Sequence, residues 1–455
     1  MSIRQKHPRE PLLQGRWSQS FAILVISVAI FTDNFLYLVV VPVIPWSITE
    51  RVGVRPEDVQ FWTSCLLAVH SAGLLVSGTL SGYIADHVSR RLPYLIGLCA
   101  LAGSTLLLCL GRTIGLIALG RVLQGVSSGV VWTVGLAILV DQVGPDHIGY
   151  TMGYIGIAVN AGTLMGPVFG GIVMRQAGYY AVFAMCLALV TLDIIFRFCL
   201  PDKPARLSFF DPEANGSVYS YPGQPSSLES SPLLSHNLVQ NTTTRPVVIH
   251  LLRSRRLLVA LWGTFMQSVL ICGFYSVLPL FVWETFGWDA MAAGLIFLPI
   301  ALPCLLGPLL GTLTDQWGPR YIGSAGFLLA APCLIVLQTV AEDTLICKVI
   351  LAVLLLLVGI SLQAVLPPTM AEICFVVDNM EQEHPEIFGY GSAYAQAFGL
   401  SCTSFAAGTA VGPIWAGFMR EKFGWTALTW SLGAVSVLTG VAMGTWLGVP
   451  STKEI

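Results

Sequence analysis

The sequence contains the segment Gly82-Tyr-Ile-Ala-Asp-His-Val-Ser-Arg-Arg91, which recurs later in the chain as Gly311-Thr-Leu-Thr-Asp-Gln-Trp-Gly-Pro-Arg320. Both copies place an aspartate four residues after a glycine, with arginine four or five residues beyond. A second repeat pairs Gly162-Thr-Leu-Met-Gly-Pro-Val-Phe-Gly-Gly171 with Gly408-Thr-Ala-Val-Gly-Pro-Ile-Trp-Ala-Gly417, identical at five of ten positions. The two repeats follow in the same order, so the sequence predicts two homologous halves.

Composition indicates that lipid surrounds most of the chain. Of 455 residues, 55% are hydrophobic and only 11% are charged, whereas soluble domains average about 25% charged residues. So few charges cannot cover the surface of a soluble protein of this length. The net charge of −2 gives no reason to expect a nucleic-acid partner. No Cys-x-x-Cys pair or Cys/His cluster predicts a metal site, and we expect no cofactor.

Twelve segments are apolar enough to cross a bilayer, which takes roughly 20 residues. They are 18–42, 59–85, 93–111, 114–140, 148–174, 179–200, 257–283, 290–313, 320–340, 346–371, 389–418 and 426–447. Pro367-Pro368 interrupts the tenth span, and we expect the helix to kink or stop there. The fold class predicted is an all-α membrane protein with twelve transmembrane helices.

A polar stretch separates the first six spans from the last six. Residues 201–256 are rich in Pro, Ser, Asn and Gly, which predicts a disordered linker. The expected organisation is a tail (1–17), a six-helix bundle (18–200), the linker (201–256), a second six-helix bundle (257–447) and a short tail (448–455). Two repeated halves around a site at mid-membrane are typical of secondary transporters.

The distribution of Lys and Arg predicts the orientation in the membrane. With the N-terminus inside, the inner segments hold 15 of the 23 basic residues and the outer segments hold 7. Cytosolic loops carry such an excess. We therefore expect both termini and the linker in the cytosol. The linker segment Glu229-Ser-Ser-Pro-Leu-Leu234 is similar to an acidic dileucine sorting signal, which favours a vacuolar or vesicular membrane over the plasma membrane.

These motifs resemble those of a known family. The segment from Gly82 to Arg91 resembles the signature loop of the major facilitator superfamily, and the segment from Gly162 to Gly171 fits its antiporter motif. Gly120-Arg-Val-Leu-Gln-Gly125 resembles the arginine motif of the fourth helix. The first span, from Phe31-Thr-Asp33-Asn34 onward, is similar to that of drug:proton antiporters with twelve helices. Within that branch the likeness is to vesicular amine transporters and their fungal relatives.

Charged side chains inside a bilayer are functional candidates, because each costs roughly 2.5–3.5 kcal/mol on insertion scales. The predicted spans hold five such groups of interest: Asp33, His70, Arg121, Asp193 and Glu372.

Three of these groups are predicted to couple protons. Asp33 lies near the middle of the first span, and desolvation helps a carboxylate bind a proton; it could also pair with a cationic substrate. His70 titrates near neutral pH when unperturbed, although a packing role stays open. Arg121 keeps its charge and needs a carboxylate or carbonyl partner. The family resemblance implies a coupling role for Arg121, whereas anchoring the helix start is the alternative.

The repeated loops are predicted to form a gate at the inner membrane edge. Asp86, Arg90 and Arg91 belong to the first loop, with Gly82 before them, and the second loop contributes Asp315 and Arg320. The resemblance implies a charge network that holds the inner gate shut. The alternative is ordinary cytosolic loop chemistry.

Four glycines of the antiporter motif fall on one helix face. Gly162, Gly166, Gly170 and Gly171 are spaced so that another helix could approach closely. Pro167 removes a backbone hydrogen bond and should bend the helix. A tight, leak-resistant seam and simple packing are both consistent with this face.

Several polar and aromatic residues are candidates for lining a substrate cavity. They are Asn34, Trp132, Tyr154, Tyr275, Glu372 and Tyr394. The eleventh span has no acidic residue, and spacing puts Leu366 where vesicular amine transporters have one in the tenth helix. A neutral substrate therefore fits as well as a monoamine.

The leading functional hypothesis is proton-coupled export of a small organic molecule from the cell or into an organelle. No nucleotide-binding P-loop is present, so transport must use an ion gradient. Alternatives are a uniporter or symporter for nutrient uptake, and a receptor or scaffold without flux. Nothing in the chain predicts an enzyme. We expect a monomer whose partners are the substrate, protons and the lipid bilayer.

Overall fold

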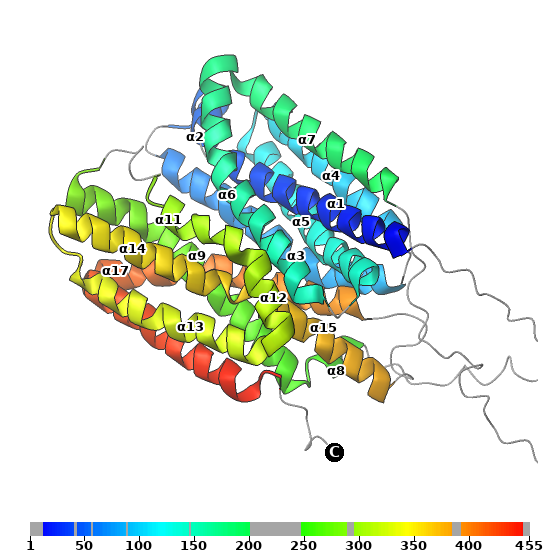
Figure 1. Cartoon of the computed structure of the whole chain (residues 1–455). Coiled ribbons are helices and arrows are strands. Elements are labelled where there is room, and N and C mark those ends of the chain that lie inside the picture. The colour runs from blue at the N-terminus through cyan, green and yellow to red at the C-terminus, as the bar shows by residue number, and fades with distance from the viewer. Residues whose placement is uncertain are drawn as a thin grey trace, which may run out of the picture.

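The structure is a computed structural model that describes residues 12–40, 43–55, 58–87, 90–144, 147–200, 247–288, 295–384 and 393–448. Its helices form two bundles, one from each half of the sequence (Figure 1). The helices of the first half are α1 (Leu12–Val39), α2 (Val43–Ser47), α3 (Val59–His87), α4 (Arg91–Leu110), α5 (Ile114–Val143), α6 (Ile148–Ala177) and α7 (Tyr179–Cys199), with a π-helical turn at Ile48–Val52. Those of the second half are α8 (Val247–Leu251), α9 (Arg255–Phe286), α11 (Leu298–Ala301), α12 (Gly307–Trp317), α13 (Pro319–Val336), α14 (Leu345–Gln363), α15 (Leu366–Glu383) and α17 (Tyr394–Trp446).

The helices provide the twelve predicted spans. Eleven helical segments in the described residues are long and apolar enough to cross a membrane. One of them, α17, has 53 residues, or roughly 80 Å of helix, which is more than twice the thickness of a bilayer core. Gly424 interrupts α17 with φ 82° and ψ 178°, so α17 contains both the eleventh and the twelfth span.

The tenth span stops near its two prolines, as predicted. Helix α14 ends at Gln363, and α15 begins at Leu366, with Pro367 and Pro368 in its first turn. Proline fits a first turn because the N–H it lacks has no acceptor there. The break thus lies just before the prolines.

Two predicted boundaries differ from the structure. Helix α1 begins at Leu12, six residues before the predicted span. The last ten residues of the predicted linker are not a disordered segment, because α8 and the start of α9 occupy them. The apolar run at Val247–Leu251 explains the difference, since Leu251 is fully buried and apolar burial stabilises a helix that composition alone would not predict. Residues 201–246, with the dileucine-like segment, lie outside the described residues.

In both halves, glycines let two helices approach each other closely. Cβ atoms added at Gly162, Gly166 and Gly170 of α6 would come within 2.6–3.0 Å of backbone oxygens of α1. In the second half, added Cβ atoms at Gly408 and Gly412 of α17 would be equally close to backbone oxygens of α9. The predicted close approach is confirmed at these glycines. Gly171 differs, because open space lies where its Cβ would be, and Pro167 lies inside the continuous helix α6.

We predict that Gly162→Ala destabilises the protein and that Gly171→Ala does not. The added methyl group at Gly162 would lie 2.6 Å from the Phe31 carbonyl oxygen, and overpacking of this kind typically costs about 1–3 kcal/mol. Thermal unfolding in detergent, followed by tryptophan fluorescence, measures both variants against the wild type. Equal midpoints for the two alanine variants would contradict the packing assigned to this seam.

Candidate functional site

One face of α5 carries a row of buried polar side chains in the first half. Arg121, Gln124 and Ser128 are each no more than 1% exposed, and Trp132 lies one turn further along. Their spacing of three or four residues puts them on the same helix face. The helix therefore presents a cation, an amide, a hydroxyl and an indole N–H to α1 and α3.

Asp33 of α1 meets this row. Its carboxylate accepts hydrogen bonds from Ser128 Oγ and from Trp132 Nε1, the latter at 3.0 Å. The side chain is 5% exposed. Two donors and a buried position fit a group that exchanges a proton, because the donors stabilise the ionised form while burial favours the neutral one. The neighbouring Asn34 instead donates to the Ile30 carbonyl oxygen of its own helix.

His70 of α3 lies on the same row. Its Nε2 is 3.5 Å from Ser128 Oγ, and its ring centroid is 4.5 Å from that of Tyr37 on α1. Ser128 therefore connects Asp33 to His70. Sequence reasoning missed Ser128 and Tyr37; the register of Ser128 with Arg121 and Gln124 on α5 was the available signal.

Arg121 is fully buried beside this group. Its Nη1 donates to Gln124 Oε1 at 2.8 Å and, more weakly, to the Tyr37 carbonyl oxygen at 3.4 Å. Within the described residues, its Nε and Nη2 have no hydrogen-bond partner. The structure thus gives Arg121 the carbonyl partners that the sequence required. Asp33, His70 and Arg121 thus lie along one face of α5, inside the first half, and their role in proton coupling stays a prediction.

Asp86 connects the two halves at the end of the bundle where α1 begins and α17 ends, which we call the terminal end. An even number of spans puts these two helix ends on the same side. The carboxylate of Asp86 accepts the backbone N–H groups of Ala395, at 3.2 Å, and of Gln396, at 2.9 Å. These are the first free N–H groups of α17, and a helix N-terminus attracts negative charge.

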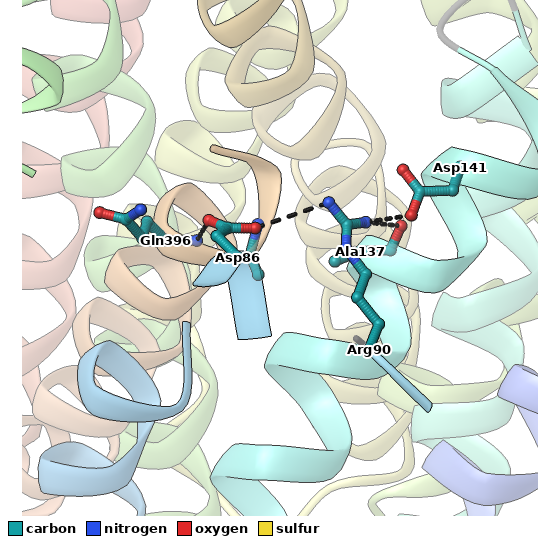
Figure 2. A network of polar contacts seen from close by, with 6 residues as sticks. Asp86, Arg90, Ala137, Asp141 and Gln396 are labelled. Carbon is teal, nitrogen blue, oxygen red and sulfur yellow. Dashed lines mark hydrogen bonds and ion pairs between the residues drawn. The ribbon is translucent and has the colours of Figure 1, made fainter. Parts of the chain in front are cut away.

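Arg90 fixes the orientation of Asp86 (Figure 2). Its Nη2 lies 3.5 Å from Asp86, while its Nη1 donates to Asp141 and to the Ala137 carbonyl oxygen on α5. The charge network predicted for this loop is present for Asp86 and Arg90. Arg91 begins α4 and is exposed.

Asp315 makes the equivalent contact in the opposite direction, from the second half to the first. Its carboxylate accepts the backbone N–H groups of Gly149 and Tyr150, both at 2.9 Å, at the start of α6. Each half therefore places one aspartate on a helix N-terminus of the other half. The second arginine departs from the symmetry, because Arg320 donates to the Gly444 carbonyl oxygen of α17 within its own half.

Glycines let the halves touch at the terminal end. A Cβ at Gly82 would clash with the Ala395 backbone. The pairs Gly78–Gly399, Gly149–Gly311 and Gly153–Gly307 are in backbone contact in the same way. Thr79 and Thr403 also bond across the halves, at 2.9 Å. These contacts lie in the parts of α3, α6, α12 and α17 nearest the terminal end, which is closed.

This arrangement can be compared with known proteins. The sequence profile of the Major Facilitator Superfamily matches residues 23–381. This chain belongs to the Major Facilitator Superfamily. An uncharacterized MFS-type transporter of Schizosaccharomyces pombe, C18.02, is 33% identical over 90% of this chain and 92% of its own length. The MFS-type transporter ppzB of Metarhizium rileyi is 29% identical over 96% of both chains.

Two further similarities agree with the sequence prediction. A probable vesicular acetylcholine transporter-B of Danio rerio is 27% identical over 96% of this chain and 80% of its own length. The crystal structure of the human organic anion transporter MFSD10 (TETRAN) matches with a TM-score of 0.68 at 19% identity, covering 95% of this chain and 100% of that one. Like these relatives, the present chain is a multi-pass membrane transporter and not an enzyme.

The aromatic residues that the sequence predicted to line a substrate cavity lie in different parts of the structure. Trp132 donates to Asp33 and stacks on Phe405 of the second half, with ring centroids 6.3 Å apart. Tyr275 packs edge-on against Phe297 in the second half. Tyr154 bonds to the hydroxyl of Tyr150 at 2.9 Å. Only Trp132 joins the site built around Asp33.

Tyr394 and Glu372 belong to the terminal end. Tyr394 is the first residue of α17, and its hydroxyl donates to Asp378. Glu372 is fully buried and pairs with Arg256 Nε at 2.6 Å, while the Gly448 N–H donates to the same carboxylate oxygen at 3.0 Å. These contacts tie α9, α15 and the end of α17 together. They do not support the predicted substrate contact of Glu372.

We predict that Glu372→Gln lowers stability and leaves the apparent affinity for substrate unchanged. Removing one partner of a buried ion pair typically costs about 3–5 kcal/mol, and Arg256 would lose its carboxylate. Thermal unfolding measures the stability, and a concentration series of transport rates measures the affinity. A changed affinity with unchanged stability would restore Glu372 as a cavity residue.

Proposed function

We propose that this protein is a proton-coupled antiporter that exports a small organic molecule from the cell or sequesters it in a vacuole or vesicle. The observation that carries the proposal is the buried carboxylate of Asp33, held by Ser128 and Trp132 beside His70. An ionisable residue inside the membrane marks a functional site by default, and a carboxylate such as Asp33 can bind a proton. Binding a proton there neutralises the site, so proton and substrate can alternate.

The substrate class is proposed to be small organic molecules such as drugs, toxins or secondary metabolites. The similarity to vesicular acetylcholine transporters supports the movement of a small organic molecule into a vesicle. The second half supplies little negative charge for an amine, because its buried Glu372 is paired with Arg256. Neutral molecules therefore belong in any substrate panel beside acetylcholine.

The orientation follows from the basic residues. We place the terminal end in the cytosol, because the segments at that end carry 15 of the 23 Lys and Arg residues and cytosolic loops are enriched in them. The contacts of Asp86 and Asp315 then close the cytosolic side. The structure would correspond to the conformation that releases substrate outward and picks up a proton.

Reconstituted monomers in liposomes test this proposal. The liposomes contain a trapped pH indicator and carry an imposed pH gradient, and acetylcholine or a neutral dye is added in turn. We expect a substrate to release protons down their gradient and to accumulate against its own. Substrate flux without proton movement would replace the antiporter by a uniporter, and binding without any flux would make the protein a receptor.

A further inference from the structure

A second buried carboxylate lies behind α1, and the site described above does not use it. Asp193 of α7 is 1% exposed. Within the described residues, neither of its oxygens has a hydrogen-bond partner. The hydroxyl groups of Tyr94 on α4 and Thr32 on α1 are buried nearby, and in the described residues the Tyr94 hydroxyl has no hydrogen-bond partner either. Buried polar oxygens of three helices therefore gather here, and the Thr32 hydroxyl is the donor that faces the Asp193 carboxylate.

The surroundings of Asp193 contain few groups that could stabilise a negative charge. From α1 it faces Thr32 and Asp33, and from α4 it faces Tyr94. On its own helix, Arg197 lies one turn later, donates to the Leu200 carbonyl oxygen at 3.2 Å and lies over the Tyr94 ring. Among the described residues, no titratable group of α6 contributes to the electrostatic potential at Asp193.

A buried carboxylate that faces a single hydroxyl donor is far more costly ionised than protonated. In this packing the Asp193 carboxyl group therefore holds a proton. A charged Asp33 nearby favours that proton further, because two close carboxylates resist simultaneous ionisation. The charge on either carboxylate thus changes the proton affinity of the other.

Thr32 is the α1 residue that faces the Asp193 carboxyl group. It is adjacent to Asp33 in sequence, yet it faces Asp193 on α7 while Asp33 faces Ser128 on α5. A hydroxyl can donate a hydrogen bond to a carboxylate and accept one from a carboxylic acid. Thr32 therefore links the proton affinity of Asp193 to the position of α1.

We propose that Asp193 is a second proton-binding residue of this transporter, buried behind α1 and coupled to Asp33 through their charges. Asp193 lies six residues before the end of α7 at Cys199, toward the terminal end. The first half then holds two carboxyl groups that bind protons. This inference rests on the proposed proton coupling.

Infrared spectroscopy of the purified full-length protein in detergent tests proton binding without any substrate. The carboxylic-acid C=O band is followed from about pH 5 to about pH 9, a range around the usual titration of perturbed carboxyl groups. We expect Asp193→Asn to remove one titrating component, and Asp33→Asn to remove another and to move the midpoint of the Asp193 component. An unchanged band in Asp193→Asn would overturn the proposal.

A second pair of variants keeps both carboxyl groups. Thr32→Val should move the midpoint of the Asp193 component, whereas Thr191→Val, whose exposed hydroxyl bonds to Leu187 on the same helix, should not. Equal spectra for the two valine variants would overturn the link. A protein without coupled flux that retains both titrating components would reject the proposed function and leave Asp193 as a proton site.

Discussion

Asp33→Asn is expected to reduce transport driven by a pH gradient to the level of empty liposomes. Asparagine keeps the size of the side chain, and its Oδ1 can accept the Trp132 N–H while its NH2 group donates to the Ser128 hydroxyl, but it cannot bind and release a proton. Because Asp33 is the carboxylate of the α5 site, no coupled step is then left there. The measurement is uptake of a substrate into proteoliposomes with and without the imposed gradient.

Exchange of labelled for unlabelled substrate provides the control for Asp33. Exchange needs no net movement of protons, so Asp33→Asn should retain it if the protein folds and binds. Asp33→Glu keeps a carboxyl group and should retain part of the gradient-driven rate. Full gradient-driven transport by Asp33→Asn would remove Asp33 from the coupling mechanism.

Asp86→Asn together with Asp315→Asn is expected to open the terminal end. Each carboxylate binds two N–H groups at a helix N-terminus of the other half. Such a contact contributes up to about 2 kcal/mol when partly buried. Losing both charges should cost about 2–4 kcal/mol, which shifts the ratio of closed to open conformations by roughly 30- to 700-fold. Either single variant should shift it by about tenfold.

Hydrogen exchange measures this opening at the backbone N–H groups that bind Asp86 and Asp315. The N–H groups of Ala395, Gln396, Gly149 and Tyr150 exchange with solvent only when the halves separate, so peptides that contain them should exchange faster in the double variant. Asp343→Asn is the matched control, because Asp343 forms an exposed ion pair with Lys348 away from the contact between the halves. Identical exchange in the double variant and this control would contradict the gate.

The two predictions concern the same cycle. In the proposed antiport cycle, a proton on Asp33 changes the charge between α1 and α5, and the aspartates at the terminal end act as the gate. Antiport requires the two to be connected, because a gate that opened without regard to protonation would leak. The Asp86 contact reaches α5 through Arg90 and Asp141, and α5 also carries Ser128 and Trp132. Helix α5 is thus the element common to the gate and the proton site.

Sequence patterns were sufficient for the membrane fold and for part of the site. Asp33, His70 and Arg121 could be chosen because an ionisable side chain inside the bilayer is costly and is therefore a functional candidate, whatever its partners. Asp86 and Asp315 could be chosen because their loops repeat. In contrast, Glu372 looked like a cavity residue by the same reasoning, yet it pairs with Arg256, a residue 116 positions away. Depth in the membrane can be read from sequence, whereas the direction of a side chain cannot.

The amino-acid sequence alone was enough to predict twelve spans, two homologous halves and the glycine seams, because these depend on local hydrophobicity and on the size of side chains. The folded structure was needed to show that Asp86 binds the start of α17, that Ser128 joins Asp33 to His70, and that Asp193 is buried behind α1. Those facts depend on how each helix is rotated about its axis and on which half it touches. Apolar residues on nearly every face of a membrane helix leave that rotation unmarked in the sequence.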